Sequence, residues 1–544
     1  MALGEAFFTR RRLLELAALA AAGLASSRSA AWASARPLFD RLKVDVSGHP
    51  FADDGQRLAT VGRAAGRATA RLSFRLARPA EISFDVLQTG QGVASEQPVT
   101  SGQTGLSAQR LTLEAGAHTV DWTPAPTLPP RTYVLRLSAK DGRRTEVRRA
   151  TVRVLGVDAG FSTGSVRQGG SAGLVVRTDA NSLILQMLHC GPESEETYAN
   201  DELKGVPVGG PAVHDWSRRR NAPAALYLGF PAEWPSGIYA ARLDADDGRV
   251  GFAPIVVSPA APAHRVAVVV PVTTWQAYNF YDADGDGWGD TWYARWHTRD
   301  VDLRRPHSRR GVPYRFRSYE LSFYHWLFAH GAGVDYYSDE DVERFGGPAA
   351  LRAAYDLLVF PGHTEYVTAA LYDSVAGFRD LGGNLLFLSA NNFFRRVDRS
   401  GHGVHLIEEW RKLGRPEAGL CGVQYVASDR GERHAPFTVT GADAAPWAFE
   451  GTGLANGSQF GLYGIEIDAR AASSPAQTSV LATIPDLFGP GRSAEMTYYE
   501  HGSGARVFSA GALNFGGQVL LWDETARLLG NVWRRLGGQL ASPA

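Results

Sequence analysis

The pattern of hydrophobic residues changes its period about halfway along the chain, and this change constrains the fold more than any other feature. Before residue 259, apolar and polar residues alternate in short segments such as 81–87 and 133–138. After residue 263, apolar residues form continuous runs, as at 265–271 and 356–362. Alternation is typical of strands with one buried face, whereas continuous runs are typical of strands buried on both faces.

The alternating half divides into two units, residues 36–154 and 155–258, each made of short segments bounded by turn residues. This spacing predicts two antiparallel β-sandwich domains of the immunoglobulin or fibronectin type. Residues 259–263 read PAAPA, and we interpret them as a linker.

In residues 264–540 the apolar runs alternate with helical stretches at 318–330 and 368–381. Strands that alternate with helices predict a doubly wound, mainly parallel sheet, here of the glutamine-amidotransferase-like (flavodoxin-like) kind. The whole chain is therefore expected to be a multidomain protein of α/β plus all-β class.

The composition narrows the range of partners. With 544 residues the chain is too long for one core, and its 56 Lys and Arg residues balance 56 Asp and Glu residues. No global charge would draw it to nucleic acid, so we expect no such partner. No run of about 20 apolar residues is present after the N-terminal segment, so we expect no membrane span.

Residues 1–35 look like a targeting segment. Arg10, Arg11 and Arg12 precede a weakly apolar run at 15–24 and small residues at 31–35. This resembles a twin-arginine export signal, with an ordinary secretory signal as the alternative, and predicts a periplasmic or secreted protein. The chain has two cysteines, Cys190 and Cys421, and the sequence leaves open whether they pair.

Chemically capable residues follow three of the predicted buried strands. They are Trp275, Tyr278 and Asn279 after the first strand, His363 and Glu365 after the second, and Asn391 and Asn392 after the third. Ligands of open α/β sheets bind beyond the carboxyl ends of the strands. We therefore expect the first group to line a substrate pocket and the other four residues to be catalytic.

Familiar hydrolase patterns are absent from these positions. Two matches to the G-x-S-x-G pattern, at Ser162 and Ser171, lie in the β region and do not join a strand to a helix. The turn at 362–363 has no cysteine, and Cys421 has no histidine beside it. The histidines at 402 and 405 are interpreted as part of a surface loop. Hydrolysis would then need activated water, which points to a metal.

An acidic loop follows the first strand of this half. Asp282, Asp284, Asp286 and Asp290 match the first half of an EF-hand-type calcium loop, but position 12 is Tyr293 instead of glutamate. Structural Ca²⁺ and a metal-free solvated turn are the two interpretations. In either case we expect an insertion at the rim of the pocket that braces residues 275–279.

Several strings carry a family resemblance. In chain order they are WPSGIY (234–239), WQAYN (275–279), GHTEYVTAAL (362–371), GGNLLFLSANNFFRRV (382–397), YGIEID (463–468) and AEMTYYEHGSGARVFSAG (494–511). Together they resemble the large (beta) subunit of N,N-dimethylformamidase and proteins that share its C-terminal domain. The likeness covers roughly residues 154–536, so the first sandwich is outside it.

The resemblance implies a ferric ion held by two tyrosines and one glutamate, which hydrolyses a small formamide. Carried onto this sequence, it makes Tyr366 a ligand, Glu466 the carboxylate and Tyr337 the second tyrosine, with Tyr324 and Tyr336 as alternatives. Asp468 would stand behind Glu466. The metal would activate water and polarise the amide, with the residues after the second strand, His363 or Glu365, as proton carrier.

Two departures separate this chain from the family pattern, and they leave two functions open. The acidic loop is inserted, and Val367 follows Tyr366 where tryptophan is common. The first function is an exported metal-dependent hydrolase that cleaves the C–N bond of a small amide. The second is a non-catalytic secreted protein that binds carbohydrate or a protein partner, with calcium holding the loop. The characterised relative works with a small subunit, so a homo-oligomer or such a subunit is expected.

Overall fold

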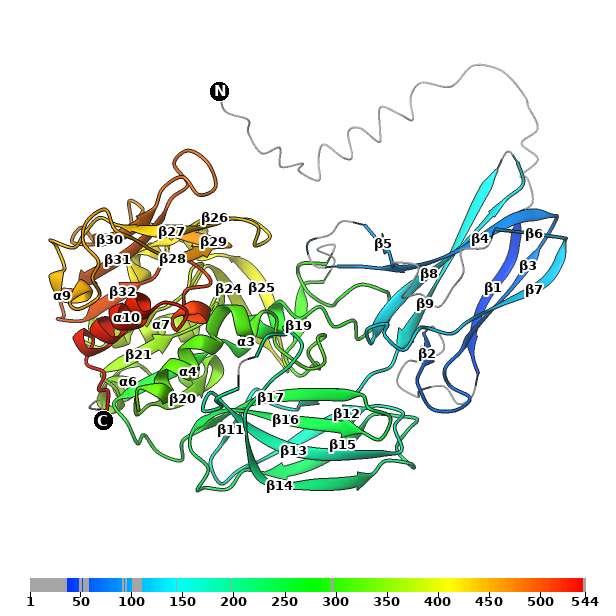
Figure 1. The fold of residues 1–544 in the computed structure, drawn as a ribbon, viewed down its shortest axis with the longest axis horizontal. Helices are drawn as coiled ribbons and strands as arrows, with labels where there is room; N and C mark the ends of the chain where they lie inside the picture. The colour runs from blue at the N-terminus through cyan, green and yellow to red at the C-terminus, as the bar shows by residue number, and fades with distance from the viewer. Residues whose placement is uncertain are drawn as a thin grey trace, which may run out of the picture.

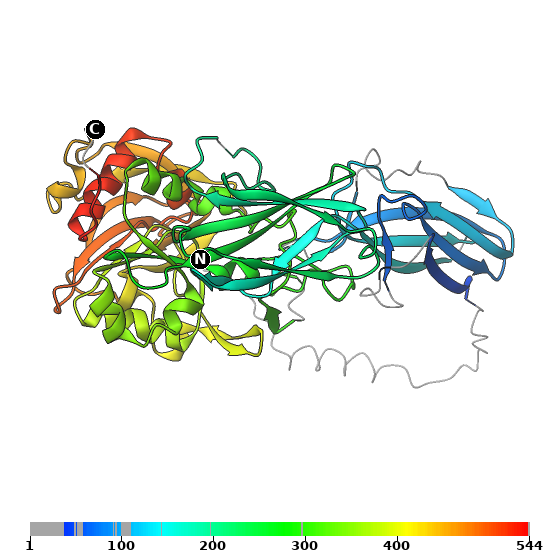
Figure 2. The same ribbon diagram turned by 90° about the horizontal axis from the view of Figure 1, so that it is seen from below.

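A computed structural model describes residues 37–541, apart from residues 48–50, 52–57, 91, 93–94, 100–109, 143, 196 and 295–297. The predicted export signal at residues 1–35 lies outside the described residues. Within them the chain is a β-rich, multidomain protein (Figure 1). The first sandwich lies at one end and the C-terminal part at the other, and the second sandwich lies below their junction in Figure 1 and in front of it in Figure 2. No helix in the described part is long and apolar enough to cross a membrane.

The first sandwich contains two sheets, with strand orders β1-β3-β7 and β2-β9-β8-β4-β5, and β6 pairs with β4. The strands are β1 (Phe39–Val46), β2 (Ala59–Val61), β3 (Ala70–Leu76), β4 (Ala80–Gln88), β5 (Gln97–Pro98), β6 (Leu111–Leu113), β7 (Gly116–Trp122), β8 (Arg131–Lys140) and β9 (Thr145–Val154). Alternate residues of both sheets, such as Leu72, Trp122 and Leu135, meet in one core. The period-two pattern therefore corresponds to strands with one buried face.

The second sandwich has the strand orders β10-β12-β15 and β11-β17-β16-β13-β14. Its strands are β10 (Asp158–Phe161), β11 (Ser165–Arg167), β12 (Ser171–Arg177), β13 (Ser182–Cys190), β14 (Val206–Asp215), β15 (Ala224–Gly229), β16 (Gly237–Ala245) and β17 (Val250–Ser258). Leu174 and Tyr239 come from opposite sheets and share a core. Ser162 and Ser171 lie at or beside its strands, as expected of chance matches.

The C-terminal part is built on a nine-stranded sheet of order β20-β18-β21-β23-β32-β31-β30-β27-β28. Its strands are β18 (Val266–Val270), β20 (Asp335–Ser338), β21 (Leu357–Phe360), β23 (Asn384–Phe387), β27 (His434–Val439), β28 (Gln459–Gly464), β30 (Ser479–Ile484), β31 (Ala494–Glu500) and β32 (Arg506–Ser509). The five strands from β20 to β32 run parallel, and the remaining four continue the sheet in antiparallel pairs. The sequence pattern did not predict this antiparallel half.

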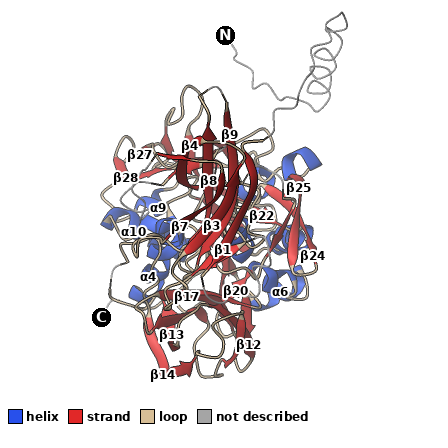
Figure 3. Cartoon of the chain, turned by 90° about the vertical axis from the view of Figure 1, so that its right-hand side faces the viewer, coloured by secondary structure: helices blue, strands red, loops and turns tan. Residues whose placement is uncertain are grey.

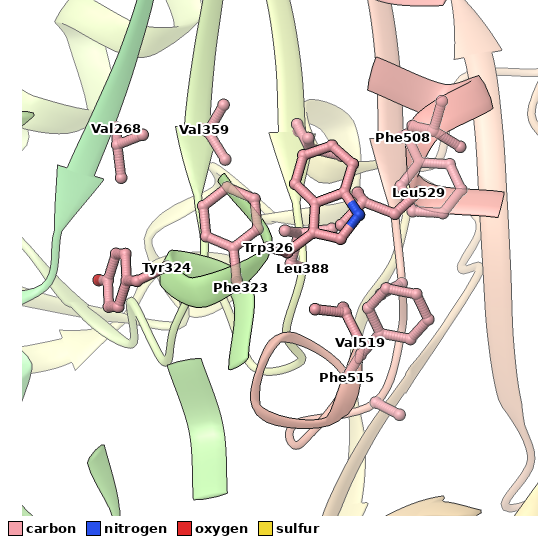
Figure 4. Packing of buried hydrophobic residues seen from close by; sticks show 14 of the residues in the cluster. Val268, Phe323, Tyr324, Trp326, Val359, Leu388, Phe508, Phe515, Val519 and Leu529 are labelled. Atoms are coloured by element: carbon pink, nitrogen blue, oxygen red, sulfur yellow. The ribbon is translucent and has the colours of Figure 1, made fainter. Parts of the chain in front are cut away.

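Helices cover this sheet on both faces (Figure 3). They are α3 (Val272–Ala277), η2 (Arg317–Leu321), α4 (Ser322–Ala329), α5 (Asp339–Glu343), α6 (Pro348–Ala354), α7 (Ala369–Asp380), η3 (Trp410–Leu413), α8 (Ala418–Cys421), α9 (Pro446–Phe449), η4 (Gly516–Gln518) and α10 (Asp523–Arg535). On one face Phe323 and Trp326 of α4 pack with Val359 (Figure 4). Helix α7 packs on the other face. Helix α7 begins where the side chain of Thr368 accepts a hydrogen bond from the backbone of Leu371.

Two smaller sheets complete the C-terminal part. One has the order β19-β25-β24-β22, and β26 pairs with β29 in the other. Their strands are β19 (Asp300–Asp302), β22 (Tyr366–Val367), β24 (Arg395–Ser400), β25 (Gly403–Glu409), β26 (Gln424–Ser428) and β29 (Glu466–Ala469). The two cysteines, whose pairing the sequence left open, are buried free thiols in different cores.

Candidate active site

The residues that follow β18, β21 and β23 meet at one edge of the sheet, because these strands are parallel. After β18, α3 carries the chain to Tyr278, and the turn after β21 supplies Glu365. The hydroxyl of Tyr278 donates a hydrogen bond of 2.5 Å to Oε2 of Glu365. The sheet therefore brings together residues that the sequence placed at separate strand ends.

Glu365 lies at the centre of a group of tyrosine hydroxyls. It is 2% exposed and also accepts a 3.1 Å hydrogen bond from Tyr293, whose hydroxyl lies 2.5 Å from that of Tyr366. On the other side, Nε of Arg395 lies 3.6 Å from Oε1 of Glu365. A buried carboxylate thus faces three phenolic oxygens and one guanidinium.

A second carboxylate, Glu466, approaches the group from β29. Nε2 of His363 lies 3.4 Å from Oε2 of Glu365 and 3.5 Å from Oε2 of Glu466. Glu466 also accepts a 2.8 Å hydrogen bond from the side-chain amide of Asn391, whose backbone N–H is held by both oxygens of Asp468. Asp468 is therefore linked to Glu466 through Asn391, which bonds to both carboxylates.

Burial and mutual repulsion change the protonation of this site. Burial, with the nearby charge of Glu365, raises the pKa of Glu466 to about 8. Burial also raises the pKa of Glu365, although its bond from Tyr278 opposes the shift. The pKa of His363 falls to about 3 because the ring is buried, so the imidazole is neutral at physiological pH. A cation would offset the cost of two buried carboxylates.

The donor set fits a hard metal ion. Phenolate and carboxylate oxygens are ligands that Fe³⁺ prefers, and both kinds converge here. Nε2 of His363 and Oδ1 of Asn391 are buried and make no hydrogen bond to the described residues. Such unsatisfied polar atoms are rare in protein interiors and are consistent with a water, ion or substrate between them.

The second tyrosine expected from the resemblance is placed elsewhere. The hydroxyl of Tyr337 pairs with that of Tyr355 at 2.7 Å, in the core on one face of the sheet, while Tyr336 points into the core on the other face. Tyr324 donates to Glu320 at 2.6 Å. None of these three tyrosines belongs to the Glu365 group in the described contacts, and Tyr278 and Tyr293 take that place. Successive residues of a buried strand face opposite cores, so Tyr336 and Tyr337 lie beside the sheet, not beyond its end.

The other pocket residues support the backbone around Tyr278. Trp275 donates its indole N–H to Oε1 of Glu320 at 2.7 Å. Asn279 donates to the carbonyl of Pro306 at 2.8 Å and accepts from the backbone of Ser308. Asn392 is buried, and its Oδ1 has no partner in the described part of the chain. The hydrogen bonds of Trp275 and Asn279 thus hold the segment around Tyr278 in place.

The acidic loop forms a compact turn between α3 and β19. Asp282 accepts the backbone N–H groups of Gly285 and Gly287 at 2.7 and 2.9 Å. Asp282, Asp284 and Asp290 each offer an oxygen within 4.8 Å of the others. Asp286 is exposed, accepts the N–H of Trp288 and is not part of that oxygen group. Burial raises the pKa of Asp282 to about 7.

This loop connects the first sandwich to the site. Arg153 of β9 donates to the carbonyl of Asp282 at 3.0 Å, and Thr89 donates to that of Gly287 at 2.6 Å. The buried Arg305 donates to the carbonyls of Asp290 and Gln276, at 2.6 and 2.7 Å. The loop is therefore tied to the segment before Tyr278, as expected of a brace.

Tyr293 is the site residue that sequence reasoning missed. It occupies position 12 of the calcium-loop pattern, three residues after Asp290. Its ring stacks on that of Tyr278, with centroids 4.3 Å apart. A tyrosine where the calcium-loop pattern has glutamate is the signal that the sequence offers for this residue.

The comparison with protein families agrees with the resemblance. The family model of the N,N-dimethylformamidase beta subunit-like C-terminal domain matches residues 207–524. A search of curated proteins gives no significant match. Among solved structures, a mutant of Salmonella alpha-2-macroglobulin and the same protein reacted with methylamine match at 10% identity, with TM-scores of 0.22 and 0.20. Each match covers 40% of this chain and 16% of the macroglobulin chain. TM-scores this low do not show a shared fold. Because the family model spans more than half of the sequence, the chain belongs to the N,N-dimethylformamidase beta subunit-like family.

Proposed function

We propose that this protein is an exported, metal-dependent hydrolase that cleaves the C–N bond of an amide. Family membership supports a dimethylformamidase-like hydrolase. The observation that best supports a metal-dependent reaction is the buried carboxylate of Glu365. It accepts hydrogen bonds from the hydroxyls of Tyr278 and Tyr293 at 2.5 and 3.1 Å. Export rests on the arginines at 10–12, and a periplasmic or secreted location follows from it.

Glu365, Tyr278 and Tyr293 would hold a ferric ion, since both hydroxyls already meet at Oε2 of Glu365. Tyr366 and Glu466, expected as ligands from the resemblance, remain the alternatives that variants can test. When bound, the ion would supply a Lewis acid that polarises the amide carbonyl and lowers the pKa of water.

The surrounding residues handle the protons. Glu466, with a pKa of about 8, can hold a proton on Oε2 near neutral pH and give it to the leaving amine. The neutral His363 lies between Glu466 and Glu365 and can pass a proton at Nε2. Asn391 orients Glu466, and the buried surroundings exclude bulk water.

A structural calcium ion at the acidic loop is a second proposal, supported by the converging oxygens of Asp282, Asp284 and Asp290. Such an ion would hold the loop that carries Tyr293. A loop of this kind would also serve the alternative function, a non-catalytic binding protein.

The fold and assembly expected from the sequence belong to the same proposal. The strand order β20-β18-β21-β23-β32, numbered along the chain, reads 2-1-3-4-5, the order of flavodoxin-like sheets. We assign residues 264–540 to a flavodoxin-like core extended by antiparallel strands. The family name describes a subunit, so association with a small subunit or with further copies is proposed.

Metal analysis of the purified mature chain separates the two functions. The enzyme predicts stoichiometric iron and a visible tyrosinate-to-iron absorption band, together with hydrolysis of linear amides. Calcium alone, in protein produced with ample iron, would favour the non-catalytic protein.

A further inference from the structure

A cavity of about 880 Å³ lies where the two sandwiches meet the C-terminal part. Pockets of this size suit ligands considerably larger than a small formamide. The first sandwich contributes Arg63, Thr89, Arg131 and Arg153 to its wall. Because the family match begins at residue 207, this wall is an addition beyond the matched region.

The lining of the cavity is strongly cationic. It contains six arginines and three aspartates: Arg63, Arg131, Arg153, Arg249, Arg309 and Arg310, with Asp158, Asp201 and Asp282. Arg249 is neutralised by Asp179 and Asp247, which lie outside the lining. Arg310 lies 3.7 Å from Asp201. The remaining arginines exceed the remaining carboxylates, so the cavity favours an anion.

Arg131 and Arg309, like Arg63, have no ion pair with a carboxylate in the described part of the chain. Arg131 is half-buried and donates to the carbonyl of Thr89 at 2.8 Å, with longer contacts to the hydroxyl of Thr89 and the carbonyl of Thr132. The guanidinium of Arg309 lies over the ring of Tyr314, 5.3 Å from its centroid. Both retain N–H donors that a carboxylate could accept.

An aromatic stack connects the cavity to the candidate active site. Tyr314 lines the cavity, and its ring is stacked on Tyr278 with centroids 5.8 Å apart and an angle of 6° between the planes. Tyr278 in turn donates to Glu365. The rings of Tyr314 and Tyr278 therefore lie between the arginine-rich wall and the reacting centre. Phe280 and Tyr281 also line the cavity.

We propose that this cavity binds the anionic end of the substrate, and that the substrate is a linear amide bearing a carboxylate. Arg131 and Arg309 would hold the carboxylate, and the aromatic side chains would contact the apolar chain that leads to the amide. This inference rests on the proposed function, since it names the substrate class of the same site. It also gives the first sandwich a role in substrate selection.

The test measures how fast the full mature chain hydrolyses the two members of matched pairs of amides. Each pair consists of an N-formyl ω-amino acid and the neutral N-alkylformamide of equal chain length, across a series of lengths. We expect a preference in kcat/KM for the anionic member at one or more lengths. Arg309→Gln and Arg131→Gln should each lower that preference by about tenfold, the usual scale for a hydrogen bond to a charged group.

Arg136→Gln is the matched control. Arg136 lies on the same strand as Arg131, is paired with Asp85 at 2.9 Å and does not line the cavity. The preference should be unchanged in this variant. Equal kcat/KM values within every pair, or a preference that survives both cavity variants, would overturn the proposal while leaving amide hydrolysis intact.

A binding measurement separates this inference from the proposed reaction. N-formyl-6-aminohexanoate is titrated calorimetrically into Glu365→Gln protein, with and without Arg131→Gln or Arg309→Gln. Weaker binding in the arginine variants supports carboxylate binding in the cavity, even if the wild-type protein hydrolyses none of the amides. Unchanged binding in both variants, or no binding of this probe or its longer homologues to the Glu365→Gln protein, contradicts it.

Discussion

Tyr278 and Glu365 lie 87 positions apart in the sequence, yet the phenol donates a 2.5 Å hydrogen bond to the buried carboxylate. The contact exists because α3 follows β18 and the turn of Glu365 follows β21, its parallel neighbour. It places a tyrosine and a glutamate, the two ligand types implied by the family resemblance, in direct contact.

Replacing the tyrosines one at a time should identify the ligands. Tyr278→Phe and Tyr293→Phe remove a phenolic oxygen beside Glu365, so each should lower iron content and weaken the tyrosinate absorption band. Tyr337→Phe removes the hydroxyl of a buried tyrosine that pairs with Tyr355 instead of Glu365, and should leave the band unchanged. Iron titration and visible absorption measure both effects. A band lost in Tyr366→Phe but kept in Tyr293→Phe would reassign the second ligand to Tyr366.

Calcium should stabilise the protein through the acidic loop. An ion that binds only the folded state adds about 2.7 kcal/mol at a concentration one hundred times its Kd. We expect Ca²⁺ to raise the unfolding temperature and Asp282→Asn to abolish the shift. Asp286→Asn removes the same charge from an exposed residue outside the oxygen group, so its effect should be smaller. If neither Ca²⁺ nor a chelator changes the unfolding temperature of the wild-type protein, the proposal of a calcium ion in this loop is wrong.

The buried Glu320 should make stability depend on pH. Burial raises its pKa to about 7 from an ordinary 4.5, so between these values the folded state binds more protons than the unfolded state. Its ionisation therefore lowers stability as pH rises from 4.5 to 7, by at most about 1.4 kcal/mol per pH unit, and has no further effect above that range.

Glu320→Gln removes this titration while an amide oxygen can still accept from Trp275. Relative to wild type, the variant should gain stability as pH rises through the same window, measured by denaturant unfolding at a series of pH values. A stability difference that stays constant between pH 4.5 and 7 would show that Glu320 titrates normally.

Two glycines with nearly the same positive φ should respond differently to alanine. Gly311 has φ +92°, and a Cβ there would lie 1.6 Å from the carbonyl oxygen of Phe252 on β17. Gly347 has φ +90° with no atom near that position. Gly347→Ala should cost about 1 kcal/mol for its positive φ, and Gly311→Ala clearly more, because the chain must also move away from β17. Equal losses in unfolding free energy would mean that this contact with the second sandwich is loose.

The sequence predicted three of the five parallel strands, β18, β21 and β23, because continuous apolar runs identify doubly buried strands. From those strand ends it also selected Tyr278, His363, Glu365 and Asn391, which the structure brings together. The antiparallel strands β27 to β31 were not predicted, since register shifts interrupt their alternation at Ala435 and Val480.

The tyrosine that the sequence proposed as second ligand, Tyr337, lies away from the Glu365 group for a different reason. Tyr336 and Tyr337 sit beside a strand end, but only three-dimensional structure shows that their rings enter cores on opposite faces. Tyr293 reaches Glu365 because the acidic loop is held by Arg305 and by Arg153, which lies 129 positions before Asp282. No local pattern encodes such docking.

Glu365→Gln tests the central claim most directly, because it removes the charge of the residue at the centre of the site and nearly preserves its shape. The account predicts stoichiometric iron and amide hydrolysis in the wild-type chain, and loss of both in the variant with no change in its folded circular dichroism spectrum. Iron binding and hydrolysis that persist in Glu365→Gln would contradict the assignment of this site.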